Sequence, residues 1–157
     1  MHDIDIKHLT RCIELADISV SEGNHPFGAL LVGPDGTVLL EGKNSHKTDG
    51  GPGHAEANVA RAAAKQFDTE TLRGSTLYTS VEPCSMCAGT TYWAEIGACV
   101  FGMTENRLAD LTGDSEENPT QALDCRIVFA AGQRQIDVRG PYPELEERIA
   151  KQHRDFW

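Results

Sequence analysis

The sequence has no apolar run long enough to span a membrane. Its first residues carry neither the basic and apolar pattern of a secretory signal nor the arginine-rich pattern of a transit peptide. It also lacks internal repeats and low-complexity segments, and 157 residues suit one domain with a real core better than two. We therefore predict a cytoplasmic protein with a single domain over residues 1–157.

Basic residues are scarce in this chain. Its 14 Lys and Arg residues are outnumbered by 24 Asp and Glu residues, which gives a net charge of −10. A surface that binds a nucleic-acid backbone needs basic side chains to displace counterions. Six acids and one arginine lie between Glu105 and Asp124. The composition therefore argues against nucleic acid and other polyanionic partners.

The cysteines do not have the spacing of a disulfide-bonded protein. The chain has five cysteines, and Cys12, Cys99 and Cys125 stand at no spacing that suggests a disulfide framework. We expect these three thiols to be reduced and largely buried, as packing residues and not as nucleophiles. The other two cysteines lie close together and call for a different interpretation.

Cys84 and Cys87 are three residues apart and follow Pro83. Proline suits the first turn of a helix, and residues i and i+3 share a helix face, so both thiols can bind one ion. Two thiolates leave a zinc ion short of ligands, and His54 is the best third candidate. Glu56 lies two residues further on, where a carboxylate can move the proton of a metal-bound water. The pattern predicts one catalytic Zn²⁺ per chain.

This ligand set predicts hydrolysis. Zinc lowers the pKa of a bound water from ~15.7 to about 7, which makes hydroxide available at neutral pH, and Glu56 can take that water's proton. The alternative is a closed structural zinc site with Glu56 as an ordinary helix-start carboxylate. The usual structural spacings would require a second Cys or His pair nearby, and the sequence has none.

Apolar periodicity predicts strands alternating with helices, and therefore an α/β fold with a mixed sheet. The first two strands form an antiparallel hairpin, and the later crossovers are parallel. Both metal-binding helices then begin at one edge of the sheet, where ligands bind. The predicted strands are 27–32, 37–42, 76–80, 98–102 and 135–139, and the predicted helices are 5–21, 54–66, 85–95, 104–111, 123–130 and 143–157.

His-x-Glu followed after 26 residues by Pro-Cys-x-x-Cys is the known signature of zinc-dependent base deaminases. On these motifs the chain resembles the cytidine deaminase-like superfamily. Further stretches resemble the small bacterial guanine deaminases, and they cover about half of the chain. These stretches are Pro26–Ala29, Gly42–Asn44, His54–Ala57, Leu77–Ser80, Glu82–Cys87 and Tyr92–Ala94.

This resemblance implies a fold and a set of substrate contacts. The fold would be a three-layer α/β/α sandwich around a mixed sheet of about five strands. Asn44 would bind the carbonyl and ring nitrogens of guanine, and the backbone amide of Ala55 would support it. Phe27 and Trp93 would form the walls of the base pocket.

The resemblance also implies a role for the end of the chain. Family members cover the pocket with their C-terminal segment, here about residues 143–157 with Phe156 and Trp157. They are often homodimers, and in some guanine deaminases the two chains exchange that segment. The small-molecule partner would be an aminated base.

The leading interpretation is therefore hydrolysis of guanine to xanthine and ammonia. Cytosine, a triazine or a pterin is the nearest alternative, because fungal cytosine deaminases share the same motifs. Editing of tRNA adenosine and a non-catalytic zinc module remain as further alternatives. His25 and His46 are expected to be solvated or turn histidines, and the acidic run is expected to form a solvated face. The acid that reads the far side of the base stays open among Asp110, Asp114, Glu144 and Asp155.

Overall fold

The computed structural model describes residues 1–157, and its centre is a mixed five-stranded sheet in the order β2-β1-β3-β4-β5. β1 runs antiparallel to both of its neighbours, whereas β3, β4 and β5 run parallel. The strands are β1 (Gly28–Val32), β2 (Val38–Lys43), β3 (Thr76–Val81), β4 (Ala98–Met103) and β5 (Asp137–Arg139).

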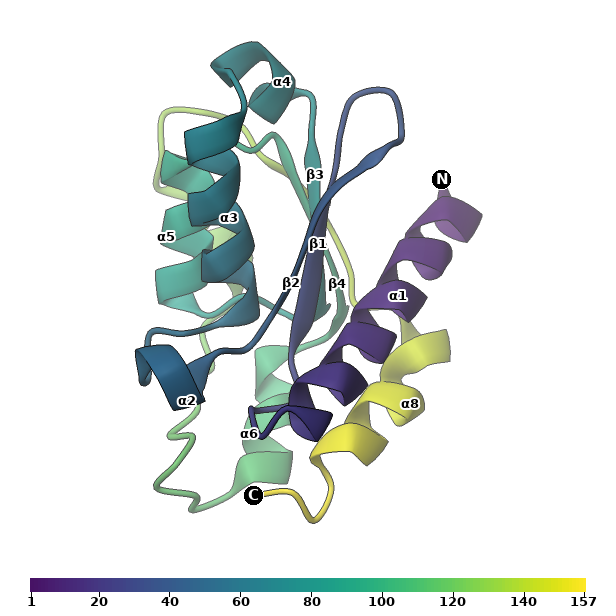
Figure 1. The fold of residues 1–157 in the computed structure, drawn as a ribbon, viewed down its shortest axis with the longest axis vertical. Helices are drawn as coiled ribbons and strands as arrows, with labels where there is room; N and C mark the ends of the chain where they lie inside the picture. Colours follow the sequence, from purple (N-terminus) through teal and green to yellow (C-terminus); the bar gives the residue numbers. More distant parts are fainter.

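Helices cover both faces of this sheet (Figure 1). α1 (His2–Ser21) and α8 (Pro143–His153) lie on one face. α3 (Ala55–Gln66) and α5 (Ser85–Trp93) lie on the other, with α7 (Cys125–Ala130) against α5. The predicted three-layer α/β/α sandwich is confirmed. No helix is both long and apolar enough to cross a lipid bilayer.

The continuous apolar run of β1 reflects burial on both sides. Ala29 and Leu31 pack in the cluster under α3 and α5, whereas Leu30 and Val32 pack in the cluster under α1 and α8. Successive strand residues point to opposite faces, so a strand between two helical layers needs apolar residues at every position.

Several element boundaries differ from the prediction. Two short helices, α2 (His46–Asp49) and α4 (Thr69–Arg73), were not expected. The last helix ends at His153, and the backbone of Asp155 takes a positive φ of 66°, so residues 154–157 leave the helix axis. A helix must stop at such a residue, because this left-handed conformation does not continue an α-helix.

The topology gathers chain ends at one edge of the sheet. The carboxyl ends of β2, β3 and β4 meet there with the amino end of β1, since β1 is antiparallel to β2 and β3. α2, α3, α5 and α6 (Glu105–Thr112) all follow this edge, which is the lower end of the sheet in Figure 1. Residues far apart in sequence therefore meet around one site.

Candidate active site

Three side chains meet where two helices begin. His54 is the N-cap residue of α3, and Cys84 is the N-cap residue of α5. The Nδ1 atom of His54 lies 3.5 Å from the Sγ of Cys84 and 3.3 Å from the Sγ of Cys87. The structure thus brings together the three residues that the sequence predicted as metal ligands.

These distances fit a zinc ion. With Zn–N near 2.0 Å and Zn–S near 2.3 Å, tetrahedral geometry places nitrogen and sulfur about 3.6 Å apart. The three donor atoms all lie within 4.8 Å of one another, and no fourth Cys, His or acid belongs to the group. Three protein ligands and one open position are the arrangement of a catalytic zinc site.

The pKa values of the two thiols are shifted in opposite directions. The pKa of Cys84 is lowered to about 4, first because the Cys87 thiol hydrogen-bonds to it and then through its contact with His54. The same hydrogen bond, together with burial, raises the pKa of Cys87. The contacts therefore favour the thiolate form at Cys84, and thiolate is the form that ligates.

Glu56 lies in the first turn of α3 and is only 5% exposed. Burial raises its pKa to about 7. A carboxyl group poised near neutral pH can both take and return a proton, which is the property of a general acid and base. Residues two apart diverge in the middle of a helix, but at its open end His54 and Glu56 line one cavity.

That cavity has a volume of about 510 Å³ and opens over the thiolate site. No Lys or Arg lines it. Its titratable lining residues are His25, His46, His54, Glu56, Cys84, Glu105 and Glu117. The cavity therefore offers imidazoles and carboxyl groups to a ligand, and no permanent positive charge from a side chain.

Asn44 connects the cavity wall to two histidines. Its Oδ1 accepts hydrogen bonds from the backbone N–H of His25 at 3.3 Å and of His46 at 2.9 Å. The two imidazoles stack with centroids 3.7 Å apart, and the Nε2 of His25 lies 2.8 Å from Oε1 of Glu117. His25 is 7% exposed and is therefore not solvated, whereas His46 is half-buried; both line the cavity, because the amino end of β1 lies beside the carboxyl end of β2.

Phe27 lines the cavity, and the end of the chain packs behind it. The ring of Trp157 lies 6.2 Å from Phe27 and 4.7 Å from His25, and Phe156 lies 6.0 Å from His25. Neither Phe156 nor Trp157 lines the cavity itself. The C-terminal segment therefore packs behind the cavity wall of its own chain, against His25 and Phe27.

The prediction that Trp93 walls the base is wrong for the single chain. Its side chain is 82% exposed and does not line the cavity. α5 begins at the metal ligands, and nine residues along a helix cover about 13 Å, so Trp93 lies at the far end. Ala55 is buried and does not line the cavity. It is the first residue of α3, so its N–H is one of the amides that have no partner within the helix.

Glu82 joins three segments without lining the cavity. Its Oε1 accepts from the backbone N–H of Glu105, and its Oε2 accepts from that of Cys125, both at 2.9 Å. This carboxylate therefore ties the loop before Cys84 to the starts of α6 and α7. Asp110, Asp114, Glu144 and Asp155 do not line the cavity, whereas Glu105 and Glu117 do.

The sequence did carry a signal for Glu105. This residue lies two positions after the end of the buried strand β4, just as Pro83 and Cys84 lie two and three positions after the end of β3. Because parallel strands end at the same edge, a polar residue in this position falls beside the metal ligands. No comparable signal marks Glu117, which lies 92 positions from its partner His25.

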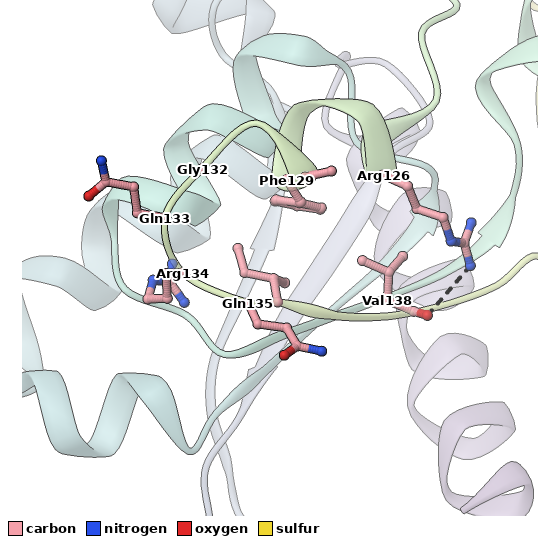
Figure 2. A pocket seen from close by; sticks show the side chains of 9 residues that line it. Arg126, Phe129, Gly132, Gln133, Arg134, Gln135 and Val138 are labelled. Atoms are coloured by element: carbon pink, nitrogen blue, oxygen red, sulfur yellow. Dashed lines mark hydrogen bonds between the residues drawn. The ribbon is translucent and has the colours of Figure 1, made fainter.

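A second cavity of about 520 Å³ lies between α7 and β5 (Figure 2). Phe129, Val138 and the backbone near Gly132 form it, and Arg126 donates to the carbonyl oxygen of Val138 at 3.5 Å. No Cys, His or acid lines this cavity. It therefore lacks the groups that metal binding or acid and base chemistry requires.

Comparison with known proteins gives a family match over most of the chain. Residues 2–103 match the cytidine and deoxycytidylate deaminase zinc-binding region. A probable cytosine deaminase of Schizosaccharomyces pombe is 33% identical over 153 residues, which cover 98% of this chain and 92% of that protein. A guanine deaminase of Bacillus subtilis is 38% identical over 104 residues, which cover 65% and 66%.

The fold has counterparts among solved structures. A guanine deaminase from Nitrosomonas europaea superposes with a TM-score of 0.72 over 92% of this chain and 80% of that one, at 21% identity. At this identity the likeness concerns the arrangement of helices and strands. The three layers described above are therefore a known architecture.

Proposed function

Because the chain belongs to the cytidine and deoxycytidylate deaminase family, whose members bind zinc, we propose that it hydrolyses the amino group of a free nucleobase. Water and the base would give the keto base and ammonia. Guanine is the first candidate substrate, with xanthine as its product. The observation that carries this proposal is the meeting of His54, Cys84 and Cys87 beside the buried carboxyl group of Glu56.

His54, Cys84 and Cys87 would hold one zinc ion, which when bound acidifies water and supplies a nucleophile at neutral pH. Glu56 would accept a proton from the attacking water and deliver it to a ring nitrogen of the base. Protonation there makes the amino-bearing carbon electrophilic. A further proton passed to the amino group lets it leave as ammonia.

Charge supports an unphosphorylated substrate. Phosphate recognition normally uses Arg or Lys, and neither lines the cavity, while Glu56, Glu105 and Glu117 do. The net charge of −10 extends the same repulsion to an RNA backbone. A free base fits these electrostatics better than a nucleotide or a tRNA loop. Binding of tRNA that weakens steeply with salt would support the editing alternative instead.

Cytosine is the second candidate substrate. The relative that matches nearly the full length of the chain is a probable cytosine deaminase, whereas the match to the guanine deaminase covers 65% of the chain. Both bases carry the ring amidine that the chemistry needs. The two candidates share the proposed roles of zinc, Glu56 and Asn44.

The test is ammonia release by zinc-loaded protein from guanine, cytosine, adenine and their nucleosides. We expect turnover of guanine or cytosine and little or none of the nucleosides. Glu56→Gln should retain one zinc per chain but lose activity about 10²- to 10⁴-fold, because the positioned proton carrier is gone. Zinc-loaded wild type that releases no ammonia from any of these compounds would favour the non-catalytic zinc module.

We also propose a homodimer, with or without exchange of the C-terminal segments. Met86 and Trp93 lie seven residues apart on α5 and are 38% and 82% exposed, so they share one stripe of this helix. Met86 also lines the cavity. An exposed apolar stripe that reaches an active site is a natural surface for a second copy.

A further inference from the structure

Glu105 is a buried carboxyl group with no partner. The residue is 6% exposed, and it lines the cavity together with Glu56 and Cys84. No hydrogen bond or ion pair engages its carboxyl group, whereas its backbone N–H donates to Glu82. Buried polar groups are normally satisfied, so one that is not calls for an explanation.

The unpaired oxygens face the cavity and not the packed interior. Only two side-chain polar atoms are both fully enclosed and without a hydrogen-bond partner, and they belong to Gln152 and His153. The carboxyl oxygens of Glu105 are not among them, so they are open to the cavity. Glu105 and Leu108 lie three residues apart on α6, and both line the cavity. Residues with this spacing share a helix face, so the Glu105 side chain lies on the cavity side of α6.

A role for Glu105 in starting α6 does not account for this arrangement. The Thr104 hydroxyl already accepts from the N–H of Arg107 at 3.1 Å, and Glu82 accepts from the N–H of Glu105. Helix capping and the favourable position of an acid in a first turn require no burial. The fold instead places this carboxyl group in the wall of the cavity, where a ligand can reach it.

We propose that Glu105 binds the substrate directly, accepting a hydrogen bond from a ring N–H of the base and thereby setting specificity. This inference rests on the function proposed above. Guanine carries such a group at N1 and cytosine carries one at its own N1. Both the ionised and the neutral carboxyl group can accept this bond, so the inference does not depend on charge.

The electrostatic surroundings agree with this role. Burial raises the pKa of Glu105 to about 9, and the charges of Glu56, Cys84 and Glu82 act in the same direction. In the neutral form the carboxyl group offers an O–H donor beside its acceptor oxygen. This pair complements a ring N–H next to a carbonyl group, an edge present in both candidate bases.

The experiment compares Glu105→Leu and Glu105→Gln with wild type in the zinc-loaded full-length protein. Each is assayed on guanine against 1-methylguanine and on cytosine against 1-methylcytosine, because the methylated bases lack the N1 hydrogen but keep the ring carbonyl group. We expect wild type to prefer the base with the N–H by about 10- to 100-fold in kcat/KM. Glu105→Leu should abolish the preference, and Glu105→Gln, which keeps an acceptor oxygen, should retain most of it.

Stability separates this role from a structural one. Removing a buried, unpaired carboxyl group should raise the melting temperature of Glu105→Leu while activity falls. Glu116→Leu, in an exposed acid of the same segment, serves as the control and should leave both properties unchanged. A Glu105→Leu protein with the wild-type preference would overturn the inference. Wild type that deaminates no base would instead overturn the proposed function.

Discussion

Asn44 is fixed at one end and free at the other. Its Oδ1 accepts from two backbone amides, while its Nδ2 has no acceptor within the chain and the residue lines the cavity. Both neighbouring groups are N–H donors, so the amide atom that faces them must be the oxygen and not the nitrogen. Asn44 therefore presents a donor to the cavity, which the proposed contact with a carbonyl group of the base requires.

Asn44→Asp tests this orientation. An aspartate keeps an acceptor for the two amides, so we expect a folded protein that binds zinc normally. The cavity side changes from donor to acceptor and repels the carbonyl oxygen of a base, which should lower kcat/KM about 100-fold. Circular dichroism, zinc content and steady-state kinetics measure the three quantities. Equal kinetics for both proteins would show that Asn44 does not contact the substrate.

The C-terminal segment beyond α8 depends on one buried histidine. His153 is fully buried, lies 5.0 Å from the ring of Phe27, and its Nδ1 accepts from the indole N–H of Trp157 at 3.2 Å. Burial lowers the pKa of His153 to about 4, and the nearby His25 acts in the same direction. Only the neutral imidazole can accept the tryptophan bond, so this segment stays in place while His153 stays neutral.

Acid should therefore loosen this segment. Between pH 6.5 and pH 4 the unfolded chain binds a proton at His153 that the folded chain does not, so the free energy of unfolding falls as pH falls through this range. We expect up to about 3 kcal/mol of loss relative to His153→Gln, which cannot titrate. Urea unfolding of both proteins at several pH values gives the difference. Parallel curves would show that folding does not lower the pKa of His153.

Removing Phe156 and Trp157 tests the role of this C-terminal segment by its effect on enzyme kinetics. These rings support His25 and Phe27 from behind, and both of these residues line the cavity. We expect KM and kcat to change together, because the wall of the cavity loses its backing. Kinetics identical to those of wild type would reduce the two residues to surface packing.

At the scale of the whole molecule, the exposed indole of Trp93 is the feature that a monomer explains least. An 82% exposed tryptophan costs solubility unless another surface covers it. If α5 carries the dimer contact, Trp93→Glu should raise the dissociation constant at least about 30-fold, since a tryptophan at the centre of an interface contributes about 2 kcal/mol or more. Sedimentation velocity over a concentration series measures this change.

Ile4→Glu is the matched control for that substitution. Ile4 is 56% exposed but lies on α1, on the opposite face of the sheet from α5. The Ile4→Glu substitution should leave the sedimentation profile unchanged. A monomeric wild type, or a Trp93→Glu protein that self-associates as wild type does, would contradict a dimer through this stripe.

Local spacing was sufficient to predict the paired thiols and the alternation of strands and helices. Cys84 and Cys87 share a helix face by their separation alone, and Pro83 marks the helix start. Apolar runs of strand length alternate with helical stripes along the chain, which is enough to predict an α/β fold with a mixed sheet. These features depend on neighbours in sequence, so the sequence determined them by itself.

Only the tertiary structure decided which other side chains reach the cavity. Trp93 was assigned to the pocket by resemblance and lies outside it, because the length of α5 carries it away from the ligands. Glu117 and His25 meet across 92 positions, since the order of the strands brings a loop and a strand end to one edge. Contacts of this kind depend on how elements pack, and no periodicity or spacing within one element encodes them.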